Sequence, residues 1–147
     1  MKIFKIAALS SALAVTIPAF AQDAFTLDPG LYAININATS AGIPLAQESM
    51  SECLPEGENT VTYAEAEQII SEDFECSYDN VFKSEGKITS DATCKMTAMD
   101  AILTGKAQVN YTGESMNLVF DGDMAVAGQN LPFNFQADAI KTSEICN

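Results

Sequence analysis

The stretch that decides the fold is Cys76–Met96, with the sequence CSYDNVFKSEGKITSDATCKM. Apolar and polar residues alternate on both sides of Ser84-Glu85-Gly86, which is the pattern of two strands with one buried face, so the stretch predicts a β-hairpin. With Gly86 in the left-handed conformation of a three-residue loop, Lys83 pairs with Lys87. The apolar positions of this hairpin are Cys76, Tyr78, Phe82, Ile88, Ala92, Cys94 and Met96.

The same register predicts the disulfide bonds. It places Phe82 opposite Ile88 and Cys76 opposite Cys94, at a non-hydrogen-bonded pair where the α-carbons of antiparallel strands are closest. The chain has four cysteines, an even number typical of disulfides in an exported protein, and none of them has zinc-knuckle or C-x-x-C spacing. The sequence therefore predicts the bond Cys76–Cys94 and, by elimination, the bond Cys53–Cys146.

A second hairpin follows, with its turn at Gly113-Glu114. A two-residue turn there gives every apolar residue an apolar partner on the neighbouring strand. The predicted pairs are Tyr111 with Met116, Val109 with Leu118 and Ala107 with Phe120.

The next turn signal is Ala127-Gly128-Gln129-Asn130, after which apolar residues alternate with polar ones up to Ala139. A four-residue loop over this signal pairs Val126 with Leu131 and Met124 with Phe133. It also sets Gly122 against Phe135, a gap that an aromatic ring can cover.

The remaining elements complete a mainly β domain of the α+β class. Strands are predicted after Pro29-Gly30, through Tyr32, and from about Ala46 to Cys53. One short helix is predicted near residues 62–73, because Thr62 and Glu65 form a capping box. The expected fold is an antiparallel meander of about six or seven strands, curled or partly barrel-like, in a single domain over residues 22–147.

Residues 1–21 have the order of a cleavable signal peptide. Lys2 and Lys5 precede an apolar run from Ile6 to Phe20, and Ala19-Phe20-Ala21 is a small-x-small cleavage site. The run is too short for a spanning helix, which needs about 20 residues. The sequence thus predicts a protein that is exported to the periplasm or secreted and keeps no integral membrane segment after cleavage.

The charge of the exported part excludes several classes of partner. It has five lysines, no arginine, no histidine and 20 acidic residues, which is a net charge of −15. Such a surface repels nucleic acid and anionic lipid, so no nucleic-acid partner is expected. The simplest interpretation of the charge is a solvated, soluble surface.

No catalytic residue, cofactor or metal site is predicted. Ser115, Ser143 and Lys106 are the candidate nucleophiles. The chain has no histidine to activate a serine. Asp121 and Asp123 alone do not make a calcium loop, since the rest of an EF-hand is missing. Met96 and Met99 have thioether spacing for Cu(I), but residues three apart on a strand point to opposite faces.

Several motifs, in their order along the chain, resemble those of the bacterial family known as domain of unknown function 3617. They are the signal peptide, Pro29-Gly30-Leu31-Tyr32, Glu52-Cys53-Leu54-Pro55-Glu56, Cys76 and Cys94 with their spacing, the segment Tyr111–Met116, and Cys146 near the end. The resemblance covers nearly the whole chain. It implies an exported, disulfide-bonded, β-rich domain, and it implies no reaction.

Two functional hypotheses follow. The first is a non-catalytic binding module whose apolar sheet face holds an apolar small molecule or a segment of an envelope protein; that face is formed by Phe82, Met116, Leu118, Phe120, Phe133 and Phe135. The second is a structural protein in which the same residues form only a filled core. An enzyme that uses carboxylates which the sequence does not identify is the remaining alternative. An open apolar cavity of several hundred cubic ångströms would favour the first hypothesis over the second.

Overall fold

The computed structural model describes residues 24–62, 74–97 and 100–146. The predicted signal peptide and all of the predicted helix except Thr62 lie outside these residues. The described part contains nine strands: β1 (Ala24–Thr26), β2 (Gly30–Ser40), β3 (Ile43–Leu54), β4 (Thr60–Thr62), β5 (Phe74–Ser84), β6 (Lys87–Met96), β7 (Ala101–Tyr111), β8 (Ser115–Val126) and β9 (Gln129–Ser143). Thr62, the predicted start of the helix, is the last residue of β4.

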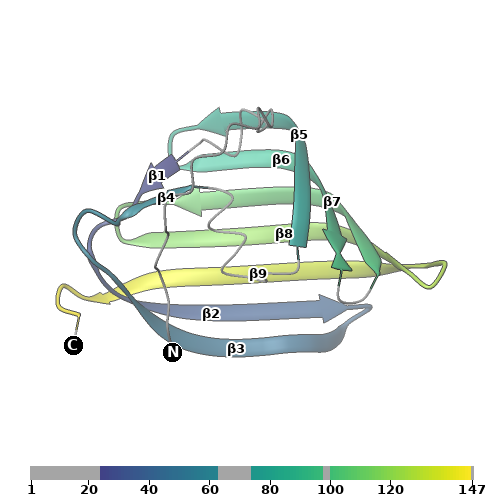
Figure 1. Ribbon diagram of the computed structural model, residues 1–147, viewed down its shortest axis with the longest axis horizontal. Helices are drawn as coiled ribbons and strands as arrows, with labels where there is room; N and C mark the ends of the chain where they lie inside the picture. Colours follow the sequence, from purple (N-terminus) through teal and green to yellow (C-terminus); the bar gives the residue numbers. More distant parts are fainter. Residues whose placement is uncertain (1–23, 63–73, 98–99, 147) are drawn as a thin grey trace, which may run out of the picture.

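Seven of these strands form one antiparallel sheet in the order β3-β2-β9-β8-β7-β6-β5 (Figure 1). Strands β5 to β9 are a meander in which each strand pairs with the next one in sequence. The β2–β3 hairpin joins this meander because β2 pairs with β9, the last strand. The expected antiparallel meander is therefore confirmed, and it is extended by one non-local pairing.

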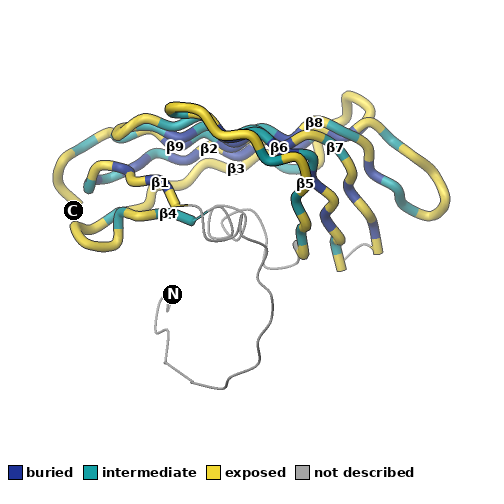
Figure 2. Tube along the Cα trace, turned by 90° about the horizontal axis from the view of Figure 1, so that it is seen from above, coloured by how far each residue is buried: buried dark blue, intermediate teal, exposed yellow. Residues whose placement is uncertain are grey.

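The sheet is arched but not closed. Strands β3 and β5 are its two edges and do not pair with each other, so the barrel-like closure considered from the sequence is not found (Figure 2). The short β1–β4 pair lies on the inner side of the arch. Phe25 of β1 is buried there and stacks on Tyr111 of β7, with 4.9 Å between the ring centroids.

The hydrophobic core covers the inner face of the sheet. Alternate residues of β2, β6, β7, β8 and β9 are buried, as the period of two predicts. Val109 in the middle of β7 is completely buried. Residues of the opposite, outer face are polar for the most part, and they are half-buried or exposed.

The β7–β8 register is the predicted one, whereas the β8–β9 register is not. Met124 pairs with Leu131 and not with Phe133. The loop has two residues, Ala127 and Gly128, and both have positive φ, which is the geometry of the short hairpin turn that best fits the twist of the strands. The predicted register was wrong by two residues, and such a shift keeps every side chain on its predicted face.

Gly122 on β8 still faces an aromatic residue, although Phe133 replaces the predicted Phe135. Gly122 also pairs with Gly105 of β7. A Cβ atom added to Gly105 would overlap the carbonyl oxygen of Asp121, so the two backbones approach too closely there for any side chain. The Phe133 ring packs edge-on against Phe120, with centroids 5.9 Å apart.

The first hairpin also differs from its prediction next to its turn. Its loop has two residues rather than three, so Ser84 pairs with Lys87 and Phe82 pairs with Thr89. The prediction that Phe82 faces Ile88 on the core side is wrong: the one-residue shift moves Phe82 to the outer face, where it is 68 % exposed.

A β-bulge restores the predicted register farther along β5. The ladder shifts between Asp79 and Phe82, and Asn80 in the bulge has a φ of 52°. The Asn80 amide donates to the Asp91 carboxylate at 2.6 Å, and the Lys106 ammonium donates to the same carboxylate at 2.9 Å. These two hydrogen bonds, the Asn80 one first, lower the pKa of Asp91 below its usual range.

Both predicted disulfides are confirmed. Cys76 and Cys94 face each other on β5 and β6, with 4.0 Å between their α-carbons. Cys53 and Cys146 are joined across 93 residues of sequence, with 5.5 Å between their α-carbons. No cysteine is left unpaired among the described residues. Two disulfides indicate an oxidising compartment outside the cytoplasm.

Candidate functional site

The predicted apolar face is part of the packed core. Five of its six residues lie on the inner side of the arch and are between 4 % and 7 % exposed: Met116, Leu118, Phe120, Phe133 and Phe135. Phe82, the sixth, lies on the outer face, as described above. In this structure the five inner side chains contact other core residues. The accessible hydrogen-bonding groups described next lie on the outer face.

The outer face carries a row of amide and carboxylate side chains across β7, β8 and β9. We call Gln108, Asn110, Asn117, Gln136 and Asp138 the amide row. Four hydrogen bonds link them: Gln108 donates to Asn110 at 3.1 Å, Asn110 donates to Asn117 at 3.1 Å, and Asn117 and Gln136 each donate to Asp138 at 2.7 Å.

The amide row has a direction that ends at Asp138. Asn110 on β7 donates to Asn117 on β8, and Asn117 donates to Asp138 on β9, whereas Gln108 and Gln136 donate along their own strands. The two oxygens of the Asp138 carboxylate accept one N–H each, from Asn117 and from Gln136. Asn35 of β2 is the register partner of Asp138, and its side-chain oxygen accepts a hydrogen bond from Ser49 of β3 at 2.8 Å. Polar side chains thus continue to the β3 edge of the sheet.

A groove of about 500 Å³ lies over one end of the amide row. Its polar residues include Asn110, Asn117 and Asp138, and its apolar residues include Tyr111 and Ile140. The latter is 55 % exposed. The complete lining is Glu85, Gly86, Asn110, Tyr111, Thr112, Ser115, Met116, Asn117, Asp138 and Ile140.

Two hairpin turns border the groove and are fixed by hydrogen bonds. In the β7–β8 turn the Thr112 N–H donates to the Ser115 carbonyl at 2.8 Å, and the two hydroxyl groups lie 2.9 Å apart. The β5–β6 turn is joined to it because the Tyr111 N–H donates to the Gly86 carbonyl at 2.8 Å. The rim of the groove is therefore held by backbone contacts.

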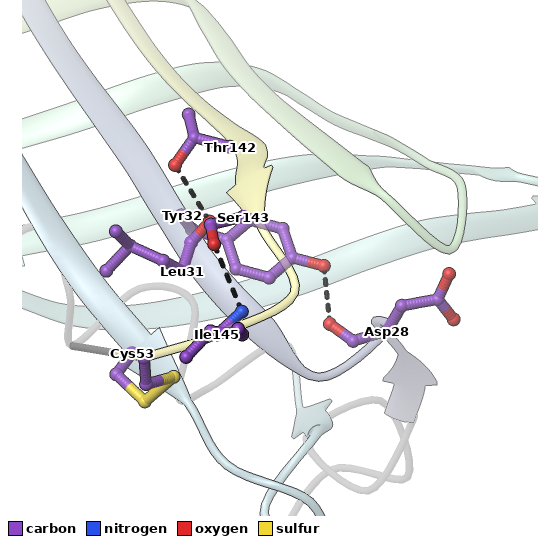
Figure 3. The surroundings of a disulfide bond; sticks show 8 residues. Asp28, Leu31, Tyr32, Cys53, Thr142, Ser143 and Ile145 are labelled. Atoms are coloured by element: carbon purple, nitrogen blue, oxygen red, sulfur yellow. Dashed lines mark hydrogen bonds between the residues drawn. A yellow bond between two sulfur atoms is a disulfide. The ribbon is translucent and has the colours of Figure 1, made fainter.

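Beside the groove, β2 is tied to the β7–β8 turn through a buried tyrosine. The Tyr32 hydroxyl lies 2.7 Å from the Asp28 carbonyl and 3.1 Å from the Gly113 carbonyl (Figure 3). The ring is 3 % exposed, and its burial raises the pKa of the phenol. Lys141 lies close by and donates to Glu144 at 2.7 Å, a hydrogen bond that raises the pKa of the Lys141 ammonium.

The Cys53–Cys146 disulfide closes the same end of the sheet. Cys53 pairs with Leu31 at the start of β2, and the Thr142 hydroxyl donates to the Leu31 carbonyl at 3.1 Å (Figure 3). The segments 29–32, 52–56 and 111–116, together with Cys146, thus meet at one end of the sheet. Four of the motifs that carry the family resemblance therefore lie at this end of the sheet, and the groove lies next to them.

The other sequence candidates do not come together in a site. Asp121 and Asp123 are exposed on β8, and Asp121 contacts Asn134 at 3.5 Å. Met96 is the last residue of β6, whereas Met99 lies outside the described residues. Within ranges 24–62, 74–97 and 100–146, no three His, Cys, Asp or Glu residues are placed to hold one metal ion.

The amide row was not predicted from the sequence, although the sequence contains a pattern that indicates it. The pairing of Val109 with Leu118 implies that Asn110 faces Asn117 on the other side of the sheet. Strand alternation identifies the core from its apolar positions, and its polar positions lie on the opposite face. Two amides paired across neighbouring strands were the available indication.

Fold and site together define a disulfide-bonded protein with an open antiparallel sheet, a packed inner face and, on the outer face, a groove lined by both polar and apolar residues. The chain belongs to the family described as Protein of unknown function (DUF3617), whose model matches residues 27–145. Comparison with curated proteins and with solved structures gave no significant match. The described residues include no helix long and apolar enough to cross a membrane.

Proposed function

We propose that this protein is an exported, non-catalytic binding module of the bacterial cell envelope and that it binds its ligand in the groove of the outer face. The observation that carries the proposal is the overlap of the 500 Å³ groove with an ordered row of hydrogen-bonding side chains. A few fixed polar groups in a concave site are the usual means of orienting a ligand. The signal-peptide pattern and the two disulfides support export.

The chemistry of the groove supports binding rather than catalysis. The Ser115 hydroxyl is hydrogen-bonded to the Thr112 hydroxyl, and the Asp138 carboxylate accepts two amide N–H groups. Activation of a nucleophile requires a base held beside it, and the groove lining offers no such pair. A fixed amide row instead supplies directional hydrogen bonds.

A purely structural role is the second candidate, and one observation favours it. The five inner apolar residues are almost completely buried, as expected of a core that serves only stability. In that case the acidic outer surface would contact cationic partners of the envelope, and the groove would be empty of ligand in the cell.

Native mass spectrometry of protein purified from its own envelope distinguishes the two. We expect a co-purified small molecule with the wild type and its loss with Asn117→Ala, which interrupts the amide row. Asn134→Ala is the matched control, because it removes an outer-face amide that is not in the groove lining. A bare protein mass for the wild type would favour the structural role, and an added mass that Asn117→Ala retains would place the ligand elsewhere.

A further inference from the structure

The amide row leaves both hydrogen-bond donors and hydrogen-bond acceptors available to a ligand. A primary amide has two N–H donors and an oxygen with two lone pairs, and the row uses one N–H of Asn110 and one of Asn117. One donor on each side chain therefore remains for a ligand. Asp138 at the end of the row offers further acceptor positions.

The charges at the groove disfavour an anionic ligand. Its lining contains two carboxylates, those of Glu85 and Asp138, and no lysine, so an anion would be repelled. The Asp138 carboxylate is already stabilised by two amide donors, so an uncharged ligand can bind beside it.

The groove also combines a polar side with an apolar side. Asn110, Asn117 and Asp138 supply the polar groups, while the exposed Ile140 supplies apolar surface. A sugar has the matching character, because its hydroxyl groups both donate and accept hydrogen bonds and its ring C–H groups are apolar. A neutral lipid tail neither donates nor accepts hydrogen bonds, and a protonated polyamine donates them but cannot accept them.

The length of the row corresponds to more than one sugar ring. From Asn110 on β7 to Asp138 on β9 the row spans two strand spacings, about 10 Å at about 4.8 Å each, and Asn35 on β2 continues the polar face by one more spacing. Phe82 lies on the outer face of β5, beyond β6. Its register partner is Thr89 of β6, and Thr89 in turn pairs with Gln108 of β7. An exposed aromatic ring therefore lies on the same face as the amide row.

We propose that the groove and the amide row bind a neutral oligosaccharide that lies across β7, β8 and β9. This inference rests on the proposed binding function and names the chemical class of the ligand. It assigns to Asn110, Asn117 and Asp138 the hydrogen bonds to sugar hydroxyls.

The test uses the disulfide-intact mature protein on an array of neutral and uronic-acid-containing oligosaccharides, followed by calorimetry with the neutral glycan that binds best. We expect binding to neutral glycans, a loss of at least tenfold in affinity for Asn117→Ala, and a change below twofold for Asn134→Ala. Circular dichroism and the two intact disulfides show that each variant is folded.

Three results would overturn the inference: no neutral glycan bound, preferential binding of acidic glycans, or equal affinity for wild type and Asn117→Ala. The proposed function fails separately. If native mass spectrometry shows a bound molecule that is not a carbohydrate and that Asn117→Ala loses, the groove is a binding site and only the ligand class is wrong. If the array and the mass spectrum are both blank, both proposals fail.

Discussion

Removal of the Cys53–Cys146 disulfide is the sharpest test of what holds this open sheet together. Both cysteines are exposed, so replacing them with serine changes little of the packing. The bond closes a loop of 93 residues, which joins β3 to the end of the chain. The main consequence of the double variant Cys53→Ser/Cys146→Ser is therefore a less restricted unfolded state.

The magnitude follows from the loop length. In the loop-entropy model a 93-residue loop corresponds to about 4.6 kcal/mol at 25 °C. The Cys76–Cys94 bond lies inside this loop and shortens its effective length by 18 residues, which reduces the value to about 4.5 kcal/mol. Because small domains are stable by about 5–15 kcal/mol, the variant should lose between about a third and nine-tenths of its free energy of unfolding.

Urea unfolding followed by circular dichroism measures the effect. We expect a lower midpoint and a larger m-value, since the unfolded chain without the bond exposes more surface. The native spectrum should be unchanged. A loss below about 1 kcal/mol would show that the bond does not act through the unfolded chain, and an altered native spectrum would show that it shapes the folded sheet instead.

Three further predictions concern single residues. Tyr32→Phe removes the hydroxyl that is hydrogen-bonded to the carbonyl groups of Asp28 and Gly113 and should cost about 1–2 kcal/mol in urea unfolding; no loss would mean that water replaces the hydroxyl. Gly105→Ala forces a Cβ atom into a backbone carbonyl of β8 and should cost more than about 2 kcal/mol by the same measurement, whereas a near-neutral result would contradict the close approach of β7 and β8. The hydrogen bonds from Asn80 and Lys106 lower the pKa of Asp91, so their stabilising effect is complete above the unfolded value of about 3.9 and is lost as the pH falls through the folded value. Carboxyl titration by NMR should show the Asp91 pKa rising in Lys106→Met, and an unchanged pKa would exclude that ion pair in solution.

The faces of the sheet were predictable because strand periodicity is a local property. Met116, Leu118 and Phe120 are buried where alternation places them, and short turns fixed the β7–β8 pairs. These features need only neighbouring strands and their turn. The pair Cys76–Cys94 is also the predicted one, because the bulge at Asn80 cancels the one-residue error at the turn.

The features that escaped prediction depend on backbone geometry or on distant contacts. The bulge at Asn80 is stabilised by the Asp91 side chain, 11 residues away, and alternation alone does not show it. The pairing of β2 with β9 has no local signal, and it brings Asn35 next to Asp138. The groove could not be predicted either, because it forms where separate turns meet.

The two register errors had unequal consequences, and the difference bears on function. An error of two residues at β8–β9 left every side chain on its predicted face, so Phe133 and Phe135 remained in the core. An error of one residue beside the β5–β6 turn moved Phe82 out of the core and onto the outer face. A single exposed aromatic ring is ordinary on a protein surface, so what matters is the face on which it lies. The same shift that removes Phe82 from the apolar face places it next to Thr89, which pairs with Gln108 of the amide row, on the side of the sheet where we propose that a ligand binds.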